Sequence, residues 1–400
     1  MRIKSANDVR EAFQNHFGEE PELIVRAPGR INLLGEHTDY NEGFVLPAAI
    51  NRAIFLAFSP QEMPKADVVA CDMHEEHATL SWEENSSIDS HHWSVYPYGV
   101  MQSIKQLHPQ LPKSGFKLVF GGDIPSGAGL SSSAAIESGI IYGLSTMFGW
   151  QLPRLEMALL AQYAEQKFVG LQCGLMDMYA SLHGKKDAVI QLDCRTQTHG
   201  YFPLDLGDYE LVLFNTNVKH ALVNSAYNRR REACEKGVEM LQKQGFSVVS
   251  LRDASMDMLL QVKSAISTEV WNRCSYVIQE NERVKAICEA LDKGNLQEVG
   301  ALMKQTHRGL SQLYEVSCPE LDFLADQAIS YAGVLGARMM GGGFGGCTLN
   351  LVHKDQVENL CQHLKFAYEK AFPLPLTWYR VTPQEGCEVV WKKNLAEISL

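Results

Sequence analysis

Apolar residues in the first half of the chain recur with two periods, one typical of strands and one typical of helices. Short or alternating apolar runs predict strands at residues 23–26, 53–58, 68–71, 116–120 and 188–193. Longer runs with the helical period predict helices at residues 9–17, 98–107, 134–148 and 153–167. The last of these begins at Pro153, and proline is well tolerated in the first turn of a helix.

The second half is richer in helix. Amphipathic patterns predict helices at residues 227–243, 268–291, 296–313 and 356–372. Strands are predicted at 211–214, at 347–352 and around Trp378 and Val389, and a glycine-rich stretch at 333–346 leads into the second of them. Strands and helices do not alternate regularly and no internal repeat is visible, so the pattern predicts an α+β fold.

Length and charge narrow the class of protein. A chain of 400 residues is longer than one hydrophobic core usually serves, so we predict two domains, at 1–200 and 201–400. The net charge of −11, without a run of basic residues, argues against nucleic acid or an anionic membrane as a partner. No secretory h-region and no apolar run of about 18 residues is visible. Ten scattered cysteines without a C-x-x-C pair indicate reduced thiols in a cytoplasmic protein.

The sequence His-Glu-Glu-His at residues 74–77 does not indicate a zinc site. Its histidines stand three positions apart, their order differs from H-E-x-x-H, and no third ligand is near. We expect a solvated turn or an edge strand there.

Residues 26–41 place polar groups at both ends of an apolar run. Arg30 precedes the run at 31–34, and Glu36, His37 and Asp39 follow it. If the run is anchored in a core, the polar groups are held in fixed positions, as a binding site requires. The alternative is a charged turn after a strand.

A glycine- and serine-rich loop at 121–135 joins a predicted strand to a predicted helix. Glycines allow close approach of a ligand, and a helix N-terminus directs free N–H groups at an anion, so the loop is suited to phosphate. It lacks the lysine of a Walker A loop, and Ser132 stands where a dinucleotide fingerprint has its third glycine. The alternative is a glycine-rich turn with serine caps. Residues 341–346 fit G-x-G-x-x-G but lead into a strand, which excludes the Rossmann interpretation.

Asp177 is an isolated carboxylate in the apolar segment 173–178. A buried aspartate needs a partner, and a structural helix cap is the alternative. A phosphate loop, an isolated carboxylate and a segment with an arginine and acidic groups together suggest phosphoryl transfer onto a hydroxyl.

Taken together, these motifs resemble those of the GHMP small-molecule kinases, and within that family the kinases of galactose. The likeness covers nearly the whole chain in the family's order, at residues 29–47, 125–135, 217–220 with Tyr227, 317–322 and 341–347. Two positions depart from the family's pattern: Met178 stands where glutamine is usual, and Met340 where threonine is usual.

The resemblance implies a two-domain fold with an N-terminal ribosomal-protein-S5-domain-2-like domain and a C-terminal ferredoxin-like domain. The active site would lie in the cleft between them. The implied reaction is ATP-dependent phosphorylation of the anomeric hydroxyl of α-D-galactose to galactose 1-phosphate, the first committed step of galactose catabolism. We expect a cytoplasmic monomer with no nucleic-acid or membrane partner.

Two alternatives to this function stay open. One is a 1-kinase for N-acetylgalactosamine or another galactose-like sugar, although the sequence Thr-Asp-Tyr-Asn at residues 38–41 favours galactose. The other is a sensor that binds galactose and ATP without turnover. The intact Ser-Ser-Ser-Ala at 131–134, together with Arg30 and Asp177, favours catalysis.

The resemblance also implies a role for each matched residue. Asp177 would accept the proton of the anomeric hydroxyl or stabilise it, and Arg30 would keep Asp177 ionised and counter charge on the transferring phosphoryl group. Sugar hydroxyls would be bound by Glu36, His37, Asp39, Gly174 and Tyr227.

The remaining matched residues would bind Mg·ATP. The phosphates would lie on Gly127, Ala128, Gly129, Leu130, Ser131, Ser132 and Ser133. Mg²⁺ would contact Ser133 and Glu165, and Trp93 and Tyr96 fall where the family lines its adenine pocket. Two aromatic residues at this spacing are also typical of a hydrophobic core, so a core position is the alternative for Trp93 and Tyr96.

Overall fold

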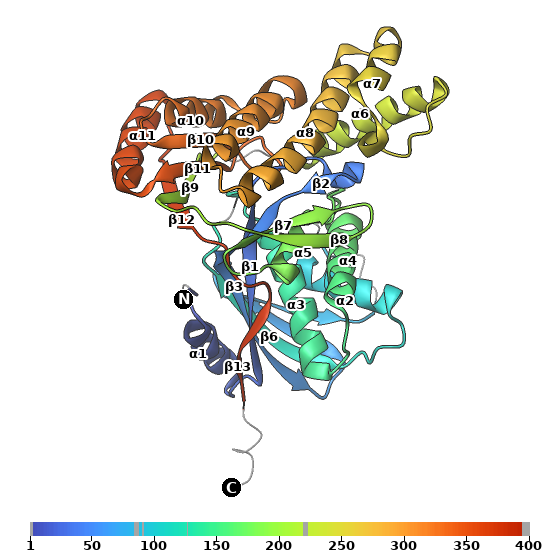
Figure 1. Cartoon of the computed structure of the whole chain (residues 1–400). Coiled ribbons are helices and arrows are strands. Elements are labelled where there is room, and N and C mark those ends of the chain that lie inside the picture. The colour runs from blue at the N-terminus through green and yellow to red at the C-terminus, as the bar shows by residue number, and fades with distance from the viewer. Residues whose placement is uncertain (1–2, 84–87, 90–91, 126, 219–222, 394–400) are drawn as a thin grey trace.

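The computed structural model describes residues 3–83, 88–89, 92–125, 127–218 and 223–393. Figure 1 shows two lobes, one built mainly from the first half of the chain and one from the second. A six-stranded sheet forms the centre of the first lobe, in the spatial order β13 (Glu388–Lys392), β1 (Leu23–Asn32), β3 (Pro47–Gln61), β6 (Gly115–Gly122), β4 (Lys65–Ala70) and β5 (Glu76–Ser81).

The two faces of this sheet are covered by different helices. Because side chains alternate along a strand, Ile24 of β1 contributes to the core with α1 (Ala6–Phe17), whereas Val25 joins the main core with the helices on the other face. Those helices are α2 (Val95–Leu107), α3 (Ser132–Phe148), α4 (Arg154–Ala164) and α5 (Met176–His183). Gly139 of α3 permits close packing, since a Cβ there would lie 2.6 Å from Leu56 Cδ1 in β3.

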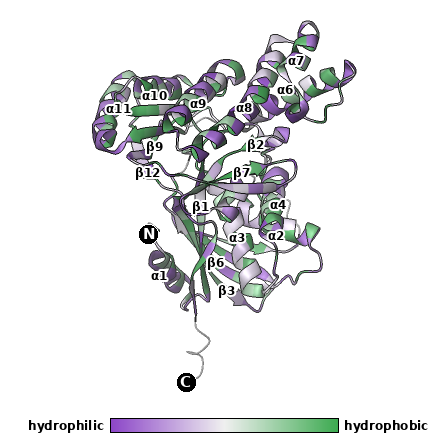
Figure 2. Ribbon diagram, viewed as in Figure 1, coloured by the Kyte–Doolittle hydropathy of each residue, from purple (hydrophilic) through white to green (hydrophobic). Residues whose placement is uncertain are grey.

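A second, four-stranded sheet organises the other lobe. Its order is β10 (Val334–Met339), β11 (Cys347–His353), β9 (Tyr209–Asn215) and β12 (Thr377–Val381). The helices packed around it are α9 (Leu296–Arg308), α10 (Pro319–Ile329) and α11 (Val357–Ala371). A further helical group consists of α6 (Val223–Lys243), α7 (Met256–Val262) and α8 (Thr268–Asp292). In Figure 2 the strands of both large sheets are mainly apolar, whereas α6 carries many polar residues.

Two smaller features connect the lobes. A three-stranded sheet is formed by β2 (Phe44–Val45), β7 (Ala188–Asp193) and β8 (Thr198–Pro203). After β12 the chain returns to the first lobe, where β13 pairs with β1. Among the described residues, no helix combines the length and the apolar character needed to cross a membrane.

The predicted α+β fold is confirmed, and every helix and strand predicted from periodicity is found. His74 and Glu75 form a turn in the left-handed region, and Glu76 and His77 begin the edge strand β5, as expected. Periodicity missed the short elements α5, α7, α10, β2 and β8, and the stretch 333–346 contains β10 as well as loop. The division at residue 200 stays a prediction, and residues 219–220 lie outside the described residues.

A buried ion pair joins the lobes. Arg338 of β10 is fully buried and pairs with Glu36, which follows β1 and is 1% exposed. The guanidinium also donates to the carbonyls of Asn32 (3.1 Å) and Leu33 (2.7 Å). Glu36 accepts further bonds from the Asn32 side chain (2.7 Å) and the Gly341 amide (3.0 Å). Burial raises the pKa of Glu36, and the charge of Arg338 opposes that rise.

Replacing Arg338 by methionine leaves the Glu36 carboxylate buried without its counter-charge. We expect Arg338→Met to lower the free energy of unfolding, measured by urea denaturation, by about 3–5 kcal/mol. The double variant Arg338→Met/Glu36→Gln removes both charges and should recover most of that loss. A single variant as stable as the unmodified protein would contradict this account of the pair.

Candidate functional site

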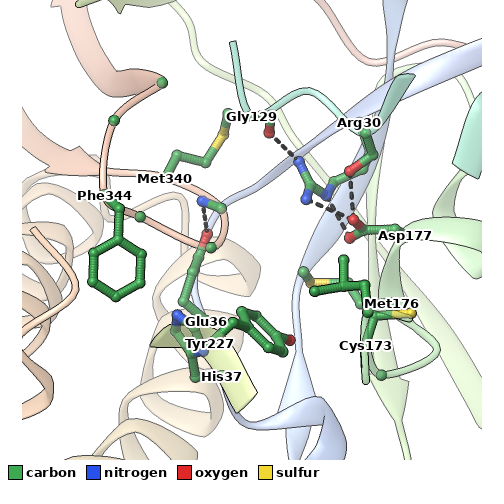
Figure 3. Close-up of a pocket in the computed structure, with 18 of the residues that line it drawn as sticks. Arg30, Glu36, His37, Gly129, Cys173, Met176, Asp177, Tyr227, Met340 and Phe344 are labelled. Atoms are coloured by element: carbon green, nitrogen blue, oxygen red, sulfur yellow. Dashed lines mark hydrogen bonds and ion pairs between the residues drawn. The ribbon is translucent and has the colours of Figure 1, made fainter. Parts of the chain in front are cut away.

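A cavity of about 520 Å³ lies between the lobes. Figure 3 shows Arg30 and Asp177 on one side of it and Glu36, His37 and Tyr227 on another. The residues singled out from the sequence that line it are Arg30, Glu36, His37, Asp39, Gly127, Gly129, Ser131, Gly174, Asp177 and Tyr227. The glycine stretch 341–346 lines it too, so all three motifs meet at one cavity.

Arg30 and Asp177 form a two-bond ion pair. Arg30 Nε and Nη2 donate to Asp177 Oδ1 and Oδ2 at 2.7 and 2.9 Å, and Nη1 donates to the Gly129 carbonyl at 2.6 Å. The Ser131 hydroxyl donates to Asp177 Oδ2 at 2.5 Å. Arg30 is 4% exposed, whereas the Asp177 side chain is 28% exposed to the cavity side. The pair is therefore rigid, and its carboxylate is accessible to a ligand.

The backbone around this pair depends on glycine. A Cβ at Gly29 would lie 2.7 Å from the carbonyl oxygen of Leu130, which accepts from the Arg30 amide at 3.1 Å. Across the loop, a Cβ at Gly341 would lie 3.2 Å from the Gly129 carbonyl oxygen, and Gly341 has a φ of +81°. Strand β1, the serine loop and the glycine stretch 341–346 thus pack backbone against backbone.

Asp39 lies against Gly174, in the same part of the cavity wall as Asp177. A Cβ at position 174 would lie 2.0 Å from Asp39 Oδ2, so glycine is required there while Asp39 keeps this position. Burial raises the pKa of Asp39 from 3.8 to about 7, and the nearby Asp177 charge adds to the rise. The Asp39 side chain is half-buried and accepts a hydrogen bond from the Tyr40 amide at 3.0 Å, so its negative charge is only partly compensated.

His37 adopts a left-handed backbone conformation, with a φ of 62°, next to Asp39. Its ring packs against Tyr227 with 5.1 Å between centroids. Burial lowers the pKa of His37 to about 3, so the imidazole is neutral at physiological pH. Its Nε2 atom makes no hydrogen bond of normal geometry, although the Gly342 backbone lies beside the ring and opposes the fall in its pKa.

Two carboxylates near the start of α3 have unsatisfied oxygens. Glu165, which begins a π-helical turn after α4, is 3% exposed, and its Oε2 has no partner. Glu137 is fully buried, and burial beside Glu165 raises its pKa well above the ordinary value. Its oxygens make no hydrogen bond of normal geometry but lie next to Glu165, which also lies beside Ser133. Two buried carboxylates beside a hydroxyl fit a hard divalent cation such as Mg²⁺.

Trp93 and Tyr96 do not line the cavity. Trp93 is 7% exposed, donates from Nε1 to Glu76 at 2.6 Å and packs against Phe120 with 5.8 Å between centroids. Burial raises the pKa of Tyr96, and the charge of Glu165 raises it further, which places Tyr96 near the Ser133–Glu165 pair. The other predicted residues that do not line the cavity are Ala128, Leu130, Ser132, Ser133 and Glu165.

Three family models match the chain in order. They are the galactokinase galactose-binding signature at residues 11–60, the GHMP kinases N terminal domain at 96–185 and the GHMP kinases C terminal at 287–370. The chain is 39% identical to the galactokinase of Thermotoga neapolitana over 368 residues, which cover 92% of this chain and 100% of that protein. This chain belongs to the galactokinase family.

Solved structures extend this likeness to the fold. Lactococcus lactis galactokinase, solved with galactose, superposes with a TM-score of 0.91 at 34% identity, covering 96% of this chain and 99% of that one. Methanococcus jannaschii mevalonate kinase superposes with a TM-score of 0.64 at 17% identity, covering 91% and 99%, and shares the fold alone. Another galactokinase relative, from Roseiflexus sp., is 38% identical over 379 residues, or 95% of this chain and 96% of that protein.

The two departures from the galactokinase family's pattern lie in different surroundings. Met340 lines the cavity, and its amide donates to the Cys347 carbonyl at 3.0 Å. Met178 is 1% exposed and belongs to the main core. Sequence reasoning also missed residues that support the site but do not line the cavity, namely Asn32, Glu137 and Arg338. Their only sequence signal is a polar residue inside an apolar run.

The raised pKa of Asp39 predicts a pH-dependent stability. The folded state holds the Asp39 proton more tightly than the unfolded state, so stability falls as pH rises from about 4 to about 7. We expect ligand-free Asp39→Asn to be more stable than the unmodified protein at pH 8, by at most about 4 kcal/mol, with a smaller difference at pH 5. Thermal unfolding at both pH values measures this, with the exposed Asp257→Asn as the control. Equal stability at pH 8 would contradict it.

Proposed function

We propose that this galactokinase family member transfers the γ-phosphoryl group of ATP to the anomeric hydroxyl of α-D-galactose, giving galactose 1-phosphate and ADP. The observation that carries the proposal is the Arg30–Asp177 pair, which lines the same cavity as the serine loop and Asp39. The galactokinase relatives, one of them solved with galactose, support the choice of sugar over the N-acetyl alternative.

In this mechanism Asp177 accepts the proton of the anomeric hydroxyl. The freed oxygen forms a bond to the γ-phosphorus of ATP as the bond from that phosphorus to the β–γ bridging oxygen breaks, and the electron pair leaves with ADP. Arg30 and the Ser131 hydroxyl hold both oxygens of Asp177 in position. The Arg30 charge also opposes the negative charge that develops on the transferring group.

We assign sugar recognition to Glu36, His37, Asp39, Gly174 and Tyr227, which line the same cavity. The carboxylates of Glu36 and Asp39 accept from sugar hydroxyls, and Tyr227 and His37 form an aromatic side of the pocket. Gly174 keeps the Asp39 carboxylate in place by having no side chain. A cluster of fixed acceptors and donors can discriminate between sugars that differ at one carbon.

We assign the ATP phosphates to the serine loop and α3, where Gly127, Gly129 and the helix N-terminus offer N–H groups. Ser133 and Glu165 would hold Mg²⁺, which supplies positive charge to the phosphate oxygens when bound. Trp93 and Tyr96 are the proposed adenine contacts.

We propose a monomer in the cytoplasm as its working state. All ten cysteines are unpaired and nine of them are buried, which suits a reducing compartment. Small molecules are then its partners.

The substrate is tested by measuring ADP release with Mg·ATP over a panel of sugars. We expect turnover with galactose and much less with N-acetylgalactosamine and glucose. Turnover with the N-acetyl sugar alone would overturn the substrate assignment. Binding of galactose without turnover of any sugar would favour a sensor.

Two variants in one cavity separate chemistry from recognition. We expect Asp177→Asn to lower kcat by about 10² or more, because proton acceptance is lost, while galactose and ATP still bind in calorimetry. The matched substitution Asp39→Asn should mainly raise KM for galactose. Indistinguishable effects of the two variants would contradict the assigned roles.

A further inference from the structure

His37 ends a chain of hydrogen bonds that starts at Cys234, which does not line the cavity. Its Nδ1 lies 2.8 Å from the Tyr40 hydroxyl, which lies 2.7 Å from the Tyr314 hydroxyl. The Tyr314 hydroxyl lies 3.3 Å from Cys234 Sγ. Tyr314 and Cys234 are buried, at 0% and 1% exposure, so water does not compete at that end of the chain.

Three separate segments bring these groups together. Tyr40 lies in the 3-10 turn Asp39–Asn41, and Cys234 lies in α6. Tyr314 is the last residue of the π-helical turn Gly309–Tyr314, which continues α9. Arg230 fixes the backbone at this point by donating to the Tyr314 carbonyl at 2.7 Å. A π-turn at such a position is typical of functional sites, because it re-aims one side chain within a helix.

The chemistry of the groups gives the chain a direction. A neutral imidazole has one donor nitrogen and one acceptor nitrogen, and a phenol is a good donor whereas a thiol sulfur is a weak acceptor. The favourable arrangement has the Cys234 thiol donating to Tyr314, Tyr314 to Tyr40, and Tyr40 to His37 Nδ1. The proton of His37 then resides on Nε2, which makes no hydrogen bond of normal geometry and lies beside the Gly342 backbone in the cavity wall.

We propose that Tyr314 and Tyr40 are positioning residues that hold His37 in the tautomer whose Nε2–H donates to an oxygen of the bound sugar. The proposal rests on the proposed function, since His37 lines the cavity assigned to galactose. Glu36 and Asp39 present acceptors to the sugar, and the chain through Tyr314 makes His37 the complementary donor. Neither Tyr314 nor Cys234 lines the cavity, so both act through His37.

The test is Tyr314→Phe, which removes one hydroxyl and keeps the ring that stacks on His37 at 4.8 Å. We expect KM for galactose to rise roughly three- to tenfold, the effect of one neutral hydrogen bond, with kcat within about twofold. In ¹⁵N NMR of histidine-labelled protein, the His37 resonances should shift from a pure Nε2–H form toward a mixture of tautomers. The His37→Asn variant identifies those resonances among the 13 histidines.

Matched variants separate positioning from loss of structure. Tyr368→Phe removes another buried hydroxyl, which donates to the Thr216 carbonyl at 2.8 Å and has no contact with the chain to His37, and should change neither KM nor the His37 signals. Cys234→Ser keeps a donor at the end of the chain and should preserve the KM of the unmodified protein, whereas Cys234→Ala should raise it.

A panel of deoxygalactoses adds a second test. The deoxy sugar that lacks the oxygen bound by His37 should bind the unmodified protein clearly more weakly than galactose does. In Tyr314→Phe the difference in affinity between that deoxy sugar and galactose should be small. An unchanged KM and an unchanged His37 tautomer in Tyr314→Phe would overturn the proposal. Absence of turnover with galactose in the unmodified protein would instead overturn the proposed function, and the NMR measurement on the sugar-free protein would still decide the tautomer.

Discussion

Arg30 is the residue on which the arrangement of the cavity depends. Its three hydrogen bonds tie β1 to α5 through Asp177 and to the serine loop through Gly129. A planar, permanently charged fork can satisfy such partners at once, which a lysine cannot. Because the arginine is buried in β1, one rigid strand positions both the Asp177 carboxylate and the serine loop, and the Ser131 hydroxyl joins these two directly.

The sugar side of the cavity is held by the second lobe. Glu36 is paired with Arg338, and the Gly35 amide donates to the buried Glu280 of α8 at 2.8 Å. Buried charges of this kind add little net stability, but they are expensive to misplace, so they define a single arrangement of the groups around them. The segment 36–39, to which we assign sugar recognition, thus belongs to the first lobe by sequence and to both lobes by its contacts.

Periodicity and composition were sufficient to predict the α+β fold, most of its helices and the strands of both large sheets except β5 and β10, since the apolar period of each of these elements is visible in the sequence. The motifs also predicted that Arg30, Asp177 and the serine loop act together, and the structure places them within hydrogen-bond distance. The role of Tyr314 could not be predicted, because a π-turn has no sequence signal and its partner Tyr40 lies 274 positions away. The hydrogen bond from the Ser131 hydroxyl to Asp177 could not be predicted either. Ser131 has a left-handed backbone, with a φ of 59°, which the sequence does not reveal.

The return of β13 to the edge of the first sheet bears on how the chain is made. Strand β1 pairs with β3 on one side and with β13 on the other, and β13 comes from residues 388–392. On a ribosome the first lobe therefore emerges with one edge of β1 unpaired, and that edge stays unpaired until residues 388–392 have been synthesised. An unpaired strand edge is prone to association with other chains. Synthesis of β13 thus completes the sheet that carries Arg30.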